Sequence, residues 1–317
     1  MPILTADYRP ARFFRNGHVN TIFSSLFRKI PQVSFTRKRI DTTDDDFLDI
    51  DFIKSDNRKV VVLCHGLEGN SSSKYIQGAS GILNANGYDI AAMNYRHCSG
   101  EINRQLRTYH SGMTEDLHTV INDLLPDYDE VFLVGFSLGG NIVLKYIGDG
   151  IYPLHPKLKA TVAISVLVDL YGAVMELSKL KNRVYTKRFL KSLCKKMRAK
   201  QEQYPSHIDL ALFKKVKDLI DFDDCFTAPL NGFENARDYY AKCSSKQFLQ
   251  NIKIPTLIIN ALDDPFMSKT CYPTAEAANN NYLNLMTPKY GGHVGFFNLQ
   301  KEISWSEEQI LTFFHKY

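Results

Sequence analysis

A serine stands between glycines in the stretch VGFSLGG, residues 134–140. An apolar run precedes it and a helical pattern follows it, so Ser137 is predicted to lie in a sharp strand-to-helix turn. The G-x-S-x-G spacing in this context is typical of a nucleophile elbow, in which the turn lifts the serine hydroxyl above a sheet. Because glycine and serine are also common in ordinary turns, the interpretation requires partner residues elsewhere in the chain.

Candidate partners follow later in the chain. A serine hydroxyl becomes a good nucleophile when a histidine accepts its proton and an acid orients that histidine, and after an elbow the expected order is serine, acid, histidine. Asp263 and Asp264 come directly after the apolar run at 254–259, and His293 follows in the loop YGGHVGF. Of the nine histidines, only His293 lies between these carboxylates and the last predicted helix. The pattern predicts a triad for acyl transfer.

Acyl transfer also needs backbone N–H donors for the oxyanion of the tetrahedral intermediate. One is expected to be the amide of Leu138, and the other that of Leu67 in the loop CHGLEGN, residues 64–70. His65 resembles a second base, but we expect it to hydrogen-bond the backbone of this loop. No cofactor or metal is expected, since the chain lacks G-x-x-x-x-G-K-[ST], HExxH and a G-x-G-x-x-G after its first strand.

Several further motifs span most of the chain: NGHVNT (16–21), HGLEG (65–69), NYRHCSGEINR (94–104), YHSG (109–112), TED (114–116) and NALDDPFM (260–267). With them the chain resembles the α/β-hydrolase superfamily and, more narrowly, its YheT-like esterase group. The resemblance implies a serine carboxylesterase-like hydrolase with Ser137, Asp264 and His293 as its triad. Such hydrolases usually show a small residue, two variable residues and then the acid, which selects Asp264 over Asp263. His97 departs from the group, which usually has glycine there.

The elements that must position these residues alternate between strand and helix. Short apolar runs predict buried strands at 59–64, 88–93, 131–134, 160–165 and 254–259. Helical patterns occupy 75–86, 114–125, 138–147 and 306–315. An antiparallel pair is predicted at 32–40 and 47–53. This alternation predicts a mostly parallel central sheet with helices on both faces. The resemblance implies that this sheet belongs to an α/β-hydrolase fold.

A long gap separates the strands at 160–165 and 254–259, too long for a single crossover helix. We therefore expect a single α/β-hydrolase domain over 1–317 that carries an inserted helical cap at 168–250. Within it, residues 179–200 hold ten Lys or Arg and no acid, which leaves the rest of the chain acidic although the whole carries +5. A nucleic-acid partner is therefore not expected, because the positive charge is confined to one segment.

The apolar residues of 179–200 recur at helical spacing. The favoured interpretation is a cap helix with its apolar face on the core and its basic face in solvent. The alternative is a peripheral membrane contact with anionic lipid. The six cysteines show no CxxC spacing, and the chain has no long apolar segment and no secretory leader pattern, so we expect a cytoplasmic protein.

The expected substrate is a small-molecule or lipid acyl ester, hydrolysed through an acyl-enzyme intermediate. Two alternatives stay open. The first is an acyltransferase on the same fold, and the second is a catalytically inactive ligand-binding protein, which an intact triad disfavours. The sequence leaves the acyl-chain length, the head group and the oligomeric state open.

Overall fold

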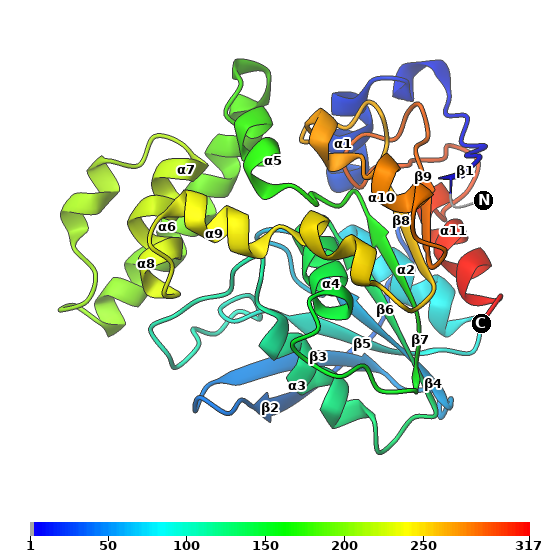
Figure 1. The fold of residues 1–317 in the computed structure, drawn as a ribbon, viewed down its shortest axis with the longest axis horizontal. Coiled ribbons are helices and arrows are strands. Elements are labelled where there is room, and N and C mark those ends of the chain that lie inside the picture. The colour runs from blue at the N-terminus through cyan, green and yellow to red at the C-terminus, as the bar shows by residue number, and fades with distance from the viewer. Residues whose placement is uncertain (1–2) are drawn as a thin grey trace.

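Nine strands form one sheet within residues 3–317, the part of the chain that the computed structural model describes. Their order is β1-β9-β8-β7-β6-β4-β5-β3-β2. The strands are β1 (Ile3–Leu4), β2 (Thr36–Asp41), β3 (Phe47–Ile53), β4 (Lys59–Cys64), β5 (Asp89–Asn94), β6 (Glu130–Phe136), β7 (Leu158–Ile164), β8 (Thr256–Ile259) and β9 (Leu283–Met286). Only the pairs β2–β3 and β3–β5 are antiparallel among these neighbours, which confirms a mostly parallel α/β sheet (Figure 1).

The five predicted core strands are all present, with ends shifted by no more than two residues. The predicted antiparallel pair is also present, although its first strand begins at Thr36 and not at residue 32. Strands β1 and β9 were not predicted. They have two and four residues, and in β9 only Leu283 and Leu285 are buried, so neither produces a recognisable apolar run.

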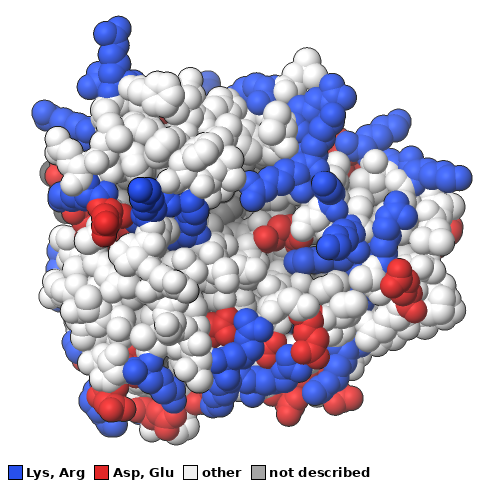
Figure 2. Space-filling view, turned by 180° about the vertical axis from the view of Figure 1, so that it is seen from behind, with Lys and Arg blue, Asp and Glu red and all other residues white. Residues whose placement is uncertain are grey.

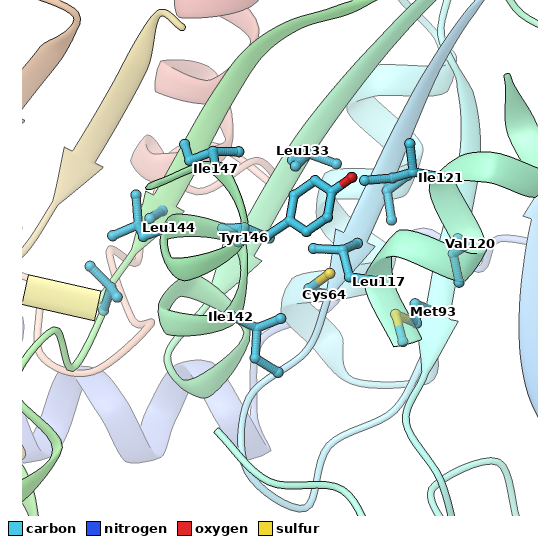
Figure 3. Packing of buried hydrophobic residues seen from close by; sticks show 14 of the residues in the cluster. Cys64, Met93, Leu117, Val120, Ile121, Leu133, Ile142, Leu144, Tyr146 and Ile147 are labelled. Atoms are coloured by element: carbon cyan, nitrogen blue, oxygen red, sulfur yellow. The ribbon is translucent and has the colours of Figure 1, made fainter. Parts of the chain in front are cut away.

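Helices cover both faces of the sheet. Those outside the β7–β8 connection are α1 (Gly17–Leu26), α2 (Lys74–Asn84), α3 (Thr114–Leu124), α4 (Leu138–Gly148), α10 (Thr274–Ala278) and α11 (Trp305–Phe314). Because successive residues of a strand point to opposite sides, Val60 and Val62 of β4 pack in one apolar cluster and Val61 and Leu63 in another. The first cluster contains α3 and α4, as Figure 3 shows, and the second contains α2 and α11.

The connection between β7 and β8 is built from helices, and we call residues 170–251 the helical insertion. It contains α5 (Leu170–Leu177), a 3-10 turn (Leu180–Asn182), α6 (Arg183–Gln203), a 3-10 turn (Leu210–Lys214), α7 (Leu219–Phe222), a π-helical turn (Asp223–Thr227), α8 (Ala228–Leu230), α9 (Ala236–Cys243) and a final 3-10 segment (Ser245–Asn251). In Figure 1, α6 to α9 lie together to the left of the sheet. Among the helices of residues 3–317, none is both long and apolar enough to span a bilayer.

Candidate active site

Ser137 occupies the turn between β6 and α4 with φ 54° and ψ −117°, a backbone conformation that is unfavourable for a residue with a side chain. The turn is tight enough to require glycine on both sides. A Cβ on Gly135 would lie 2.3 Å from the Gly139 carbonyl oxygen, and one on Gly139 would lie 2.3 Å from the Cys64 carbonyl oxygen. The glycines therefore allow α4 to approach the sheet closely, and the serine is held at the start of this helix.

The structure brings the three predicted triad residues into one chain of hydrogen bonds. His293 Nε2 lies 2.9 Å from Ser137 Oγ, and His293 Nδ1 lies 2.8 Å from Asp264 Oδ2. All three side chains are buried. The amide of Phe266 donates to the other carboxylate oxygen of Asp264 at 2.9 Å, which fixes the carboxylate toward the imidazole. This arrangement suits a nucleophile, a base and an orienting acid.

Asp263 makes no hydrogen bond to the imidazole. Its Oδ1 accepts a hydrogen bond from the amide of Gly292 at 2.8 Å, so the carboxylate holds the loop that carries His293. Burial, together with the nearby charge of Asp264, raises the pKa of Asp263. Of the two adjacent carboxylates, Asp264 therefore contacts the histidine ring, and Asp263 supports the loop beside it.

Helix α1 supports the same histidine loop from the N-terminal part of the chain. The Thr21 hydroxyl accepts a hydrogen bond from the amide of His293 at 2.7 Å and donates to the Gly17 carbonyl at 2.6 Å. A Cβ on Gly17 would lie 1.9 Å from the carbonyl oxygen of Asp263, so the helix packs directly on the acid loop. The NGHVNT motif in the sequence carries a family resemblance but does not indicate which loop it contacts.

Residues 65–69, which we call the oxyanion loop after the donor predicted at Leu67, lie against the serine. A Cβ on Gly66 would be 3.1 Å from the Cβ of Ser137. The amides of Gly66 and Glu68 donate to the hydroxyls of Tyr75 and Tyr109, each at 2.9 Å. The amide between them, that of Leu67, has no acceptor among the described residues.

The Leu138 amide is the second predicted oxyanion donor. It belongs to the first residue of α4, where N–H groups lack intrahelical acceptors and the helix dipole favours negative charge. Leu138, Leu67 and Ser137 line one cavity. The two residues predicted to supply oxyanion donors therefore lie in the wall of the same cavity as the serine.

His65 has the structural role that the sequence suggested. Its Nδ1 lies 2.7 Å from the Gly66 carbonyl oxygen, and its Nε2 accepts from the amide of Tyr95 at 3.3 Å. These partners require the neutral ring with the proton on Nδ1. Burial lowers the pKa of His65 to about 3, so the ring stays neutral and holds the start of the oxyanion loop.

Glu68 connects the oxyanion loop to helix α6, a contact that the sequence analysis missed. Its Oε1 accepts hydrogen bonds from Tyr109 Oη at 2.7 Å and Lys196 Nζ at 2.9 Å, and its Oε2 accepts one from Ser192 Oγ. The backbone at Glu68 is left-handed, with φ 57°. The HGLEG motif was the available signal, but it did not indicate a partner in the helical insertion.

Two cavities meet at Ser137. The inner cavity, ≈ 110 Å³, lies under the helical insertion and is largely apolar, with Leu167, Val174, Leu193 and Tyr239 in its wall. The outer cleft, ≈ 590 Å³, lies between α1, the N-terminal end of α2 and α6, and it includes His293. An extended substrate can therefore place one part on each side of the serine. Within residues 3–317, no group of three or more His, Cys, Asp or Glu side chains is arranged to hold a metal ion.

The chain is similar in sequence and in fold to several known proteins. The family model described as alpha/beta hydrolase fold matches residues 59–298. The Escherichia coli (strain K12) protein named "Putative esterase YheT" is 35% identical, over 96% of this chain and 92% of its own. "Phospholipase ABHD3" of Bos taurus is 30% identical over 93% of this chain and 74% of its own. The Pyrococcus furiosus esterase Pf2001 superposes with a TM-score of 0.60 at 15% identity, covering 92% of this chain and 96% of that one, so it is similar in fold.

Proposed function

Because the chain belongs to the α/β-hydrolase family, we propose that it is a carboxylic ester hydrolase that uses Ser137, His293 and Asp264 and forms an acyl-enzyme intermediate. The observation that carries this proposal is the continuous hydrogen-bond chain from the serine hydroxyl through the imidazole to the carboxylate. The names of relatives, which include esterase, phospholipase and monoacylglycerol lipase, support an ester bond as the target.

In the proposed mechanism, Ser137 Oγ attacks the ester carbonyl while His293 Nε2 takes the hydroxyl proton. Asp264 keeps the Nδ1 proton in place and stabilises the imidazolium that forms. The amides of Leu67 and Leu138 bind the oxyanion. His293 then protonates the leaving alcohol, and water attacks the acyl-enzyme by the same steps to release the acid and free the serine.

We assign the acyl group to the inner cavity and the alcohol part to the outer cleft. The wall of the inner cavity is mostly apolar, which suits an acyl chain, and the outer cleft is wider. In this assignment the insertion, predicted as a cap at 168–250, closes over the acyl chain. The substrate class is a small-molecule or lipid acyl ester.

We also propose that the enzyme works in the cytoplasm and makes peripheral membrane contact through residues 179–200. Six unpaired cysteines, four of them buried, suit a reducing compartment. The basic residues of the segment suit an anionic lipid surface.

Replacement of the nucleophile tests the proposal. Ser137→Ala is expected to abolish labelling by a fluorophosphonate probe and to lower the hydrolysis of p-nitrophenyl acyl esters by at least about 10⁴-fold, since nucleophile and base act as a unit. Ser206→Ala, which changes an exposed serine of the insertion, serves as the matched control and is expected to retain both. Full labelling or turnover by Ser137→Ala would refute the assignment.

A further inference from the structure

Large apolar side chains are exposed around the mouth of the outer cleft. On one side Leu26 and Phe27, at the end of α1, are 53% and 64% exposed. On the other side Leu180, in the 3-10 turn before α6, and Val184, in the first turn of α6, are 85% and 74% exposed. Single exposed apolar residues are ordinary, but a group around one opening marks an interaction surface.

The two sides of this mouth form one connected surface. Leu26 and Val184 line the same cleft, and the cleft reaches Ser137. The helices that carry them are joined by a hydrogen-bonding contact between His18 Nδ1 and Tyr185 Oη at 3.1 Å, with the two rings stacked. We name this surface, formed by residues 26–27 and the exposed side of residues 180–198, the cleft-mouth face.

Basic residues follow Val184 along the same side of α6. Lys187, Lys191, Lys195 and Arg198 follow Val184 at steps of three or four residues, which places them on one side of the helix. In residues 3–317 none of these four makes an ion pair, whereas Lys179 and Lys181, for example, pair with Glu176. Figure 2 shows Lys and Arg side chains spread over the side of the molecule formed by the insertion, at the right, beside a central hollow.

We propose that the cleft-mouth face docks on a bilayer that contains anionic lipid. The apolar side chains at the mouth would enter the boundary between headgroups and acyl chains, as in interfacial amphipathic helices. The uncompensated cations of α6 match anionic headgroups. Two copies of this face would repel each other, which favours lipid over a second chain as the occupant.

This inference rests on the proposed function, because it explains how an insoluble ester reaches the serine. With the mouth against the bilayer, the outer cleft opens into lipid. An acyl ester then moves from the membrane to Ser137 along a surface lined by Ile22, Leu26 and Val184 without crossing water.

Vesicle flotation tests the inference with the full chain. Phosphatidylcholine vesicles are compared with vesicles that also contain phosphatidylglycerol. We expect binding only to the second kind and a fall in binding as salt rises, since the attraction is screened. Lys187→Gln/Lys191→Gln/Lys195→Gln is expected to weaken binding by about 100-fold, at about 1 kcal/mol for each cation lost. Phe27→Ser/Leu180→Ser is expected to reduce binding at every salt concentration.

The matched control is Lys214→Gln/Lys215→Gln/Lys217→Gln, which removes the same charge from another part of the insertion and is expected to bind like the unaltered chain. All variants are assayed with p-nitrophenyl acetate, whose turnover does not depend on a membrane. A variant of the cleft-mouth face that loses vesicle binding but keeps its turnover supports the docking face. If the unaltered chain does not hydrolyse the ester at all, that result refutes only the proposed function. Equal vesicle binding by all variants, or a change of oligomeric state in Phe27→Ser/Leu180→Ser, would overturn the docking face.

Discussion

Replacing Glu68 with alanine tests how the oxyanion loop is positioned. The change removes the buried carboxylate that accepts hydrogen bonds from Tyr109, Ser192 and Lys196. Because Leu67 directly precedes Glu68, we expect these bonds to fix the direction of the Leu67 amide, the proposed oxyanion donor. An oxyanion donor stabilises the transition state more than the bound ester, so Glu68→Ala should lower kcat with little change in KM.

The expected size follows from the contacts that are lost and kept. Complete loss of one oxyanion donor lowers kcat by about 10²- to 10³-fold. The hydrogen bond from the Glu68 amide to Tyr109 Oη does not involve the carboxylate, so the loop stays partly anchored. We therefore expect a loss of about 10- to 100-fold in kcat. Removing one partner of a buried ion pair costs about 3–5 kcal/mol, and since the Lys196 side chain keeps 22% exposure, we expect the unfolding free energy to fall by about 2 kcal/mol.

The double variant Glu68→Ala/Lys196→Met separates positioning from stability. Methionine removes the unpaired ammonium, so urea unfolding should show most of the lost stability restored. The kcat should stay low, because α6 is still detached from the loop. Steady-state kinetics on a p-nitrophenyl ester measure this. Recovery of kcat together with stability, or an unchanged kcat in Glu68→Ala, would refute the argument that Glu68 positions the loop.

Three further changes probe the surrounding groups. Asp264→Asn should lower kcat by about 10⁴-fold because the amide no longer selects the Nδ1–H tautomer, whereas Asp263→Asn should cost far less, and equal losses would contradict the assignment. His97 adopts φ 63°, a conformation that glycine tolerates better than alanine. The free energy of unfolding in urea should therefore be about 1 kcal/mol higher for His97→Gly than for His97→Ala, and equal values would show no backbone strain there. Burial raises the pKa of Asp223 to about 6, so its cost to stability is absent below about pH 4, grows as the pH rises from about 4 to 6 and stays constant above that. Asp223→Asn should therefore raise the unfolding free energy by about 2 kcal/mol at pH 7.5 and leave it unchanged at pH 4, and the same gain at both would reject this.

The core strands and the elbow could be predicted because their causes are local. Strands buried on both faces leave continuous apolar runs, and the turn at Ser137 needs glycines at fixed spacing. The support of the histidine loop is not local. Thr21 contacts the amide of His293 across 272 positions of sequence, and neither residue's neighbours indicate the other. A single sequence shows that such a polar motif is present, but it does not show which distant loop the motif contacts.

The basic segment 179–200 shows the same limit of a single sequence, because the number of lysines and arginines does not indicate which way each side chain points. We expected the basic face of 179–200 to lie in solvent, but Lys196 and Lys200 point inward. The ammonium of Lys200 is buried and donates to the carbonyls of Asn103 and Gln105, while that of Lys196 reaches Glu68. The two residues are four apart and share one side of α6. Inward lysines are stable here because carbonyl and carboxylate oxygens replace water around them. Helix α6 thus carries one cation that reaches residues 65–69 and one that holds the loop at 103–105, while others along it make no ion pair in the described part of the chain. The loops packed against the helix decide which of its lysines point inward.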